Sequence, residues 1–216
     1  MATRTGINYP KFKDQFAAMD FDAEPLPVLS LFPMPEPRTL EEWSLGFEDL
    51  EGNSKTVRWS DLQNLPRVQE PTPLVCQIFN WSEKPVVTAV RLHAVLEAAR
   101  INAPVGGYFG FYSDDRNYFE SLPRSLAHDR RTLLVYEING EPLRHELGGP
   151  VRLWVPFLQG YKSVKWLRTI RTFAHDPRGI KRILGQSKTA VLGAPGQAKA
   201  SIVMAKVESG ETPASI

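Results

Sequence analysis

The chain has 216 residues, of which 42% are hydrophobic and 23% are charged. This length supports one well-packed domain and at most a small appendage. Its 26 basic and 24 acidic residues give a formal net charge of only +2, which argues against nucleic acid or an anionic membrane surface as the main partner. No segment has the roughly 18 uninterrupted apolar residues of a membrane helix, and the first residues lack the apolar run of a secretory signal. We therefore expect a cytoplasmic protein that does not enter the membrane.

The first predicted element is an extended segment. Five of the 18 prolines fall within residues 25–37, a spacing that favours extended backbone and excludes helix. We expect this segment to wrap over the surface of the core. Residues 43–50 then alternate loosely as a strand, and residues 59–66 predict a short helical turn that ends at a proline.

An apolar, strand-like run follows at residues 73–81 and contains the only cysteine of the chain, Cys76. A single cysteine excludes a disulfide within the chain. Most lone cysteines on buried strands are inert packing residues, so the surroundings of Cys76 decide how it is interpreted.

One amphipathic helix is predicted at residues 90–99. Its apolar side chains recur at i, i+3, i+4 and i+7, and they are Leu92, Val95, Leu96 and Ala99. Strand-like runs separated by turn signals follow at residues 108–112, 132–138 and 151–155. Residues 162–173 form a further β-compatible run. Short strands with one or two helices indicate an α+β domain that is mainly β.

The composition changes near the end of the chain. Residues after 175 become polar and basic, and from residue 193 small and polar residues dominate without periodicity, as is typical of disorder. We therefore divide the chain into an N-terminal segment at residues 1–24, one domain at 25–175, and a basic, then disordered, tail at 176–216.

Polar residues in apolar surroundings are the candidates for chemistry, and four stand out: Cys76, Tyr118, Arg152 and Lys165. Taken singly, each has an ordinary structural explanation. Arg152 suits a salt-bridged strand residue, and Tyr118 suits a half-buried core aromatic. The motifs around these residues change that interpretation.

The motifs that follow Cys76 are, in chain order, Asn117-Tyr118-Phe119-Glu120-Ser121-Leu122-Pro123, Asn139-Gly140-Glu141-Pro142-Leu143, Gly148-Gly149-Pro150-Val151-Arg152-Leu153-Trp154-Val155-Pro156 and Gly160-Tyr161-Lys162-Ser163-Val164-Lys165-Trp166-Leu167. This series resembles the molybdopterin-binding oxidoreductase domain of the sulfite oxidase family. The resemblance covers about residues 25–173. It implies the sulfite-oxidase-type fold, an α+β domain that is mainly β with one or two helices.

The resemblance also implies a molybdenum–molybdopterin cofactor. In that family a cysteine thiolate and the dithiolene of a pyranopterin bind molybdenum, which exchanges an oxo group with a substrate or water in a two-electron step. Cys76 would be the metal ligand, a role that suits a soft sulfur donor. Tyr118 matches the tyrosine beside the metal, so Cys76 and Tyr118 are the expected catalytic residues. Guanidinium and backbone donors suit phosphate oxygens, so the pterin phosphate is expected to bind at Arg152, Ser163, Val164 and Lys165.

Four positions depart from the family pattern. Leu29 and Leu31 stand where polar cofactor or substrate contacts are common, Leu147 replaces a histidine or asparagine, and Phe111 replaces a serine or threonine. Each lost charged hydrogen bond is worth on the order of 1.5–3 kcal/mol. In sulfite-oxidising relatives an arginine at the position of Leu29 helps to neutralise the oxyanion, so its loss argues against sulfite as the substrate.

Two functions follow. The first is a molybdenum-cofactor oxidoreductase that acts by two-electron oxo transfer on a small molecule other than sulfite, with an external electron carrier as partner. The second is a cofactor-free descendant whose cleft binds an organic ligand or promotes a cyclisation or isomerisation, with polar contacts from Tyr118, Glu120 and Arg152. We favour the first, because the chain keeps Cys76, Tyr118, Arg152 and Lys165.

Overall fold

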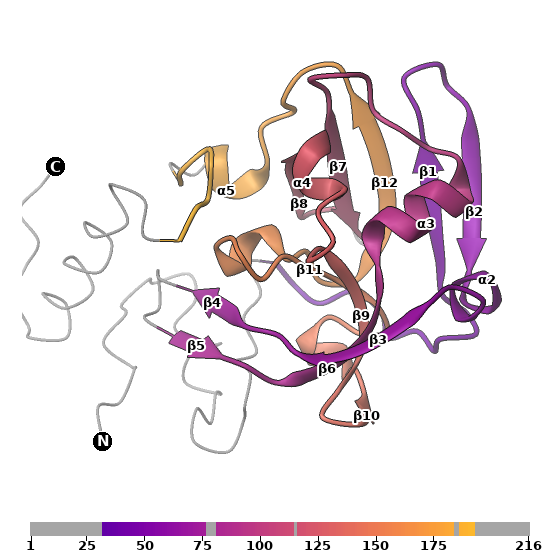
Figure 1. The fold of residues 1–216 in the computed structure, drawn as a ribbon, viewed down its shortest axis with the longest axis vertical. Coiled ribbons are helices and arrows are strands. Elements are labelled where there is room, and N and C mark those ends of the chain that lie inside the picture. The colour runs from indigo at the N-terminus through magenta and orange to yellow at the C-terminus, as the bar shows by residue number, and fades with distance from the viewer. Residues whose placement is uncertain (1–31, 77–80, 115, 184–185, 193–216) are drawn as a thin grey trace, which may run out of the picture.

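The fold was analysed in a computed structural model, which describes residues 32–76, 81–114, 116–183 and 186–192 (Figure 1). Two five-stranded sheets form most of it, with short helices at their edges. Within the described residues, no helix is both long enough and apolar enough to cross a bilayer.

The first sheet has the strand order β2-β1-β12-β7-β8. Its strands are β1 (Ser44–Glu48), β2 (Ser54–Arg58), β7 (Tyr108–Ser113), β8 (Phe119–Pro123) and β12 (Leu167–Phe173). β1 runs parallel to β12, and the other neighbours pair antiparallel. The sheet therefore joins the start of the described chain to its last strand, through a contact that no local pattern encodes.

The second sheet has the order β10-β9-β6-β3, and β11 pairs with the free side of β9. These strands are β3 (Arg67–Pro71), β6 (Val86–Arg91), β9 (Leu133–Ile138), β10 (Glu141–Pro142) and β11 (Arg152–Trp154). A separate pair consists of β4 (Leu74–Cys76) and β5 (Trp81–Glu83).

The helical elements are short: α2 (Trp59–Gln63), α3 (Leu92–Ala99), α4 (Arg124–Ala127), α5 (Ile180–Ile183) and the 3₁₀ turns η4 (His145–Leu147) and η5 (Gly160–Lys162). The longest, α3, buries the four apolar residues of its predicted stripe. It ends at Arg100, whose left-handed backbone (φ 54°) breaks the helical hydrogen-bond pattern.

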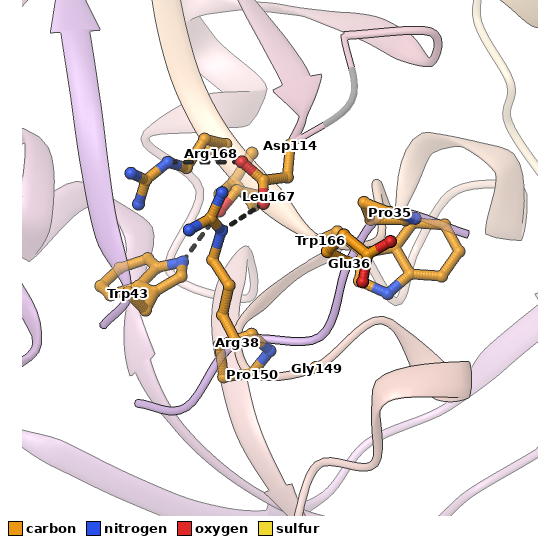
Figure 2. Close-up of a pocket in the computed structure, with 10 residues that line it drawn as sticks. All are labelled: Pro35, Glu36, Arg38, Trp43, Asp114, Gly149, Pro150, Trp166, Leu167 and Arg168. Carbon is orange, nitrogen blue, oxygen red and sulfur yellow. Dashed lines mark hydrogen bonds and ion pairs between the residues drawn. The ribbon is translucent and has the colours of Figure 1, made fainter. Parts of the chain in front are cut away.

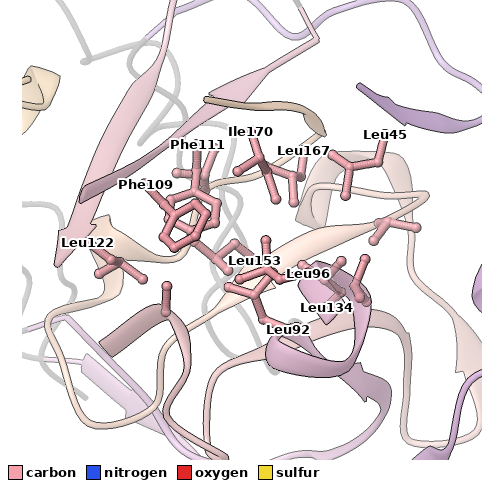
Figure 3. Packing of buried hydrophobic residues seen from close by; sticks show 14 of the residues in the cluster. Leu45, Leu92, Leu96, Phe109, Phe111, Leu122, Leu134, Leu153, Leu167 and Ile170 are labelled. Atoms are coloured by element: carbon pink, nitrogen blue, oxygen red, sulfur yellow. The ribbon is translucent and has the colours of Figure 1, made fainter. Parts of the chain in front are cut away.

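The main hydrophobic cluster lies between the first sheet, α3 and the inner faces of β9 and β11 (Figure 3). Side chains on β9 alternate between two clusters, as the pleat of a strand requires. Leu134 and Tyr136 enter the main cluster, whereas Leu133 and Val135 enter a second cluster that contains Trp154. Because both faces of β9 are covered, it has an almost continuous apolar sequence.

The structure confirms the predicted α+β, mainly β fold, and it confirms the helix within residues 90–99. The prediction of a continuous β run at residues 162–173 was wrong at its start. A 3₁₀ turn at η5 is closed by the Ser163 N–H, which donates to the Gly160 carbonyl, and the strand begins only at Leu167. The predicted contact positions Leu29 and Leu31, and the predicted disordered tail from residue 193, lie outside the described residues.

Candidate functional site

Arg152 is the central charged residue of the candidate site. It lies on β11 with only 4% of its surface exposed. Its two terminal nitrogens donate to the carbonyls of Leu147 (2.7 Å) and Ser163 (2.9 Å), while its buried Nε has no hydrogen-bond partner among the described residues. Burial lowers the pKa of Arg152 to about 9. A guanidinium in this position is desolvated, and its Nε–H makes no hydrogen bond to the described residues.

Lys165 lies close to this guanidinium. Its ammonium donates to the carbonyl of Glu146 at 2.8 Å. Burial, and then the positive charge of Arg152, hold the pKa of Lys165 well below its ordinary value. Neither cation forms an ion pair with a carboxylate of the described residues. A buried and a half-buried cation side by side, with no carboxylate of the described residues paired to either, form an environment that favours binding of an anion.

Ser163 and Val164 contribute less than expected. The Ser163 N–H donates to Gly160, and the Val164 N–H donates to Lys162. The Ser163 hydroxyl accepts from the Val155 N–H at 2.9 Å. Both backbone donors are therefore used inside the protein, and the two residues shape the loop around Arg152 instead of offering free N–H groups.

Tyr118 connects the strand β8 to the same loop. Its hydroxyl donates to the Tyr161 carbonyl at 2.7 Å, which fixes the ring against that loop. Tyr118 also acts on the pKa of Arg152, which places the two side chains in electrostatic contact. The predicted residues Tyr118, Arg152 and Lys165 therefore come together.

Cys76 is the last residue of β4, and its side chain lies outside the described residues. The backbone beside it is placed clearly. Val75 forms a parallel bridge with Gln159, immediately before η5. The approach is close, because a Cβ on Gly160 would lie 3.0 Å from the Val75 carbonyl oxygen. The strand that carries Cys76 therefore runs against the loop that carries Tyr161, Ser163 and Lys165.

Two of the departures from the family pattern are packing residues. Phe111 is fully buried in the main hydrophobic cluster, and Leu147 is buried in the second cluster. Leu147 still contributes a polar group, because its carbonyl accepts a hydrogen bond from Arg152. A backbone carbonyl therefore holds the guanidinium at the position where a polar side chain was expected.

The sequence analysis missed Lys162, and it gave Glu120 a different role. Lys162 and Glu120 form an ion pair at 2.7 Å whose side chains are 4% and 0% exposed. Burial raises the pKa of Glu120, against the opposing influence of Lys162. Glu120 is therefore sealed inside the protein and does not face a ligand cavity. The local signal was Lys162 itself, a second lysine in the motif at residues 160–167 beside Lys165.

No group of three or more histidine, cysteine, aspartate or glutamate side chains within the described ranges could hold a metal ion. The small cavity in Figure 2 lies elsewhere, beside Trp166 and Pro150. Its volume is about 10 Å³, no more than one water needs. Its charges pair with each other, since Asp114 bridges Arg38 (2.5 Å) and Arg168 (3.4 Å). This cavity is lined by a structural network of ion pairs, and none of the predicted site residues line it.

Known proteins resemble this chain over most of the described residues. Residues 32–181 match the family model described as oxidoreductase molybdopterin binding domain. The chain is 30% identical over 146 residues to the uncharacterized oxidoreductase YuiH of Bacillus subtilis, which covers 67% of this chain and 72% of that protein. It is 27% identical to sulfite oxidase of Arabidopsis thaliana, covering 68% of this chain but only 46% of the plant enzyme.

A solved structure shares the fold. The sulfane dehydrogenase SoxCD from Paracoccus pantotrophus superposes with a TM-score of 0.59 at 22% identity, over 66% of this chain and 41% of that one. At this identity the likeness concerns the fold alone. The SoxCD chain and the plant enzyme are therefore considerably longer than the part this chain matches.

Proposed function

Because the chain belongs to the oxidoreductase family with a molybdopterin-binding domain, we propose that it is a molybdenum-cofactor oxidoreductase acting on a small molecule other than sulfite. In this proposal Cys76 binds the metal, and Arg152 and Lys165, with the loop at Ser163 and Val164, hold the anionic end of the pterin. When bound, the cofactor supplies a two-electron centre that exchanges oxygen between a substrate and water. An external carrier then supplies or removes the electrons.

One observation carries this proposal: buried Arg152 and half-buried Lys165 place two cations side by side. Burying a charge is costly unless it is paired, and neither cation is paired with a carboxylate of the described residues. The Nε of Arg152 is a further donor, which makes no hydrogen bond within the part of the chain that the structure describes. A phosphate group would neutralise the charge and accept this donor, so the donor set fits the anionic group of the cofactor.

The other residues of the site have simpler tasks. A thiolate at Cys76 would be a soft ligand suited to a redox metal. The Tyr118 side chain, fixed by its hydrogen bond to the Tyr161 carbonyl, would lie beside the metal. We exclude sulfite because Leu29 replaces an arginine that neutralises the oxyanion in sulfite-oxidising relatives.

Metal analysis tests the proposal. The wild type, purified from a host that makes the cofactor, should carry about one molybdenum atom per chain. We expect Cys76→Ser to remove the metal and Lys165→Met to reduce its occupancy. Arg171→Met is the matched control, because Arg171 on β12 pairs with Glu48 on β1 at 2.7 Å. This variant should keep the wild-type molybdenum content. Circular dichroism verifies that each variant is folded.

Two results would overturn the proposal. Folded wild type without molybdenum would favour the cofactor-free alternative, in which the cleft binds an organic ligand. Full molybdenum content in folded Cys76→Ser would exclude Cys76 as the ligand.

A further inference from the structure

The buried ion pair of Glu120 and Lys162 has no role in the function proposed above. Three hydrogen bonds fix its charged groups. One Glu120 oxygen accepts from the Lys162 ammonium at 2.7 Å, and the other accepts from the Lys181 N–H at 2.8 Å. Lys162 also donates to the Ser121 carbonyl at 3.0 Å. The pair therefore connects three segments that are distant in sequence: β8, η5 and α5.

Stability alone gives little reason for such a pair. Removing two charges from water is expensive, and apolar residues of similar volume often serve a fold as well or better. What the pair adds is a defined geometry, because both partners accept only a narrow set of positions. The pair therefore matters most to groups whose position depends on that geometry.

The candidate site depends on it through η5. Lys162 is the last residue of this turn, between Tyr161 and Ser163. The Tyr161 carbonyl accepts from Tyr118, and the Ser163 carbonyl accepts from Arg152. A displacement of Lys162 would move the acceptors that orient both side chains.

The C-terminal segment holds the same loop from its other side. Gly179 packs so closely on Glu120 that a Cβ at this position would overlap the carboxylate. The Tyr161 hydroxyl donates to the Ser187 carbonyl at 2.8 Å, and the Gln159 N–H donates to the Ala190 carbonyl at 2.8 Å. Residues 176–183 and 186–192 therefore form a strap over η5, and Glu120 anchors the first of these two parts.

We propose that Glu120 and Lys162 are a positioning pair, which holds residues 160–165 and the overlying strap in the geometry that the cofactor site requires. The link to the cofactor rests on the function proposed above. The effect on the loop does not, because it concerns contacts within the protein.

The test uses the single variants Glu120→Gln and Lys162→Met and their combination. The combination leaves no stranded charge, and the glutamine can still accept from Lys181. The matched control combines Glu48→Gln with Arg171→Met at the ion pair between β1 and β12. For each protein we would measure thermal stability, amide hydrogen exchange across residues 158–165, and the rate of molybdopterin loss during dilution.

We expect the single variants to lose stability. The double variant should recover much of it, yet its loop should exchange about tenfold faster than in wild type and it should lose the cofactor faster. The control double variant should show wild-type exchange at the loop. Wild-type loop exchange in the folded double variant would overturn the positioning role. A wild type that carries no molybdenum would refute the proposed function instead, and loop exchange would still decide on the pair.

Discussion

Replacing Gly148 with alanine should destabilise the chain at the candidate site itself. Gly148 follows η4 and has a left-handed backbone with φ 102°. A Cβ added there would lie 2.7 Å from both Cβ and Cγ of Lys165, and 2.9 Å from its Cα. The last contact is with the main chain, so a rotation of the lysine side chain cannot relieve it.

Two separate costs add. The left-handed conformation costs a residue with a Cβ roughly 1–2 kcal/mol. Forcing a methyl group into a packed site costs about 1–3 kcal/mol more. Gly148→Ala should therefore lower the free energy of unfolding by about 2–5 kcal/mol.

Gly140→Ala is the matched control for this measurement. Gly140 is also left-handed, with φ 86°, but a Cβ there would meet nothing within 4 Å. This variant should pay only the backbone cost of roughly 1–2 kcal/mol. Urea unfolding of both variants isolates the contact with Lys165. Equal losses in the two variants would refute the reasoning, because the steric part would then be absent.

Two further predictions concern buried polar groups. The pKa of Lys165 lies well below its ordinary value of 10.5 in the folded chain. Between the folded pKa and 10.5 the unfolded chain therefore binds more protons than the folded chain does. The free energy of unfolding should rise with pH across this window, by up to about 1.4 kcal/mol per pH unit. Lys165→Met should lose this pH dependence. Urea unfolding of wild type and variant from about pH 7 to 10 tests this, and a difference in free energy of unfolding that does not change with pH would contradict the expectation. Trp43, 2% exposed, donates from Nε1 to the Leu167 carbonyl at 2.9 Å. Trp43→Phe should cost about 2 kcal/mol in urea unfolding, since it leaves a buried carbonyl unpaired, and a loss below about 0.5 kcal/mol would contradict this.

The sequence predicted elements whose signal is contained in neighbouring residues. The helix α3 was predictable because its four apolar residues recur at the helical period, and all four are buried. The strand β9 was predictable as a continuous apolar run, since both of its faces are covered. The family could also be inferred from the sequence, because its motifs are short runs of neighbouring residues.

The polar strands were not predictable in the same way. β2 has one buried residue, Val57, among exposed ones, and β3 alternates only between exposed and half-buried positions. Their strand geometry comes from hydrogen bonds to β1 and β6. A strand stabilised mainly by its neighbour carries little hydrophobic pattern of its own.

For the candidate site too, some features followed from the sequence and others did not. The family resemblance singled out Cys76 as a metal ligand, Tyr118 as its neighbour, and Arg152 and Lys165 as anion-binding groups, while the assignment of each role, and the domain limits at residues 25 and 175, remain predictions.

From its sequence alone, the chain's family, its mainly β class and the identity of its candidate residues were determined, because motif order and side-chain periodicity are properties of neighbouring residues. Only the tertiary structure decided that Lys162 is sealed against Glu120, 42 residues away in sequence. It alone also brought the strand of Cys76 against Gln159 and placed Arg152 beside Lys165, with neither in an ion pair to a carboxylate of the described residues. The charge and burial of a group depend on which distant segments pack around it, and that is decided only when the sheets assemble.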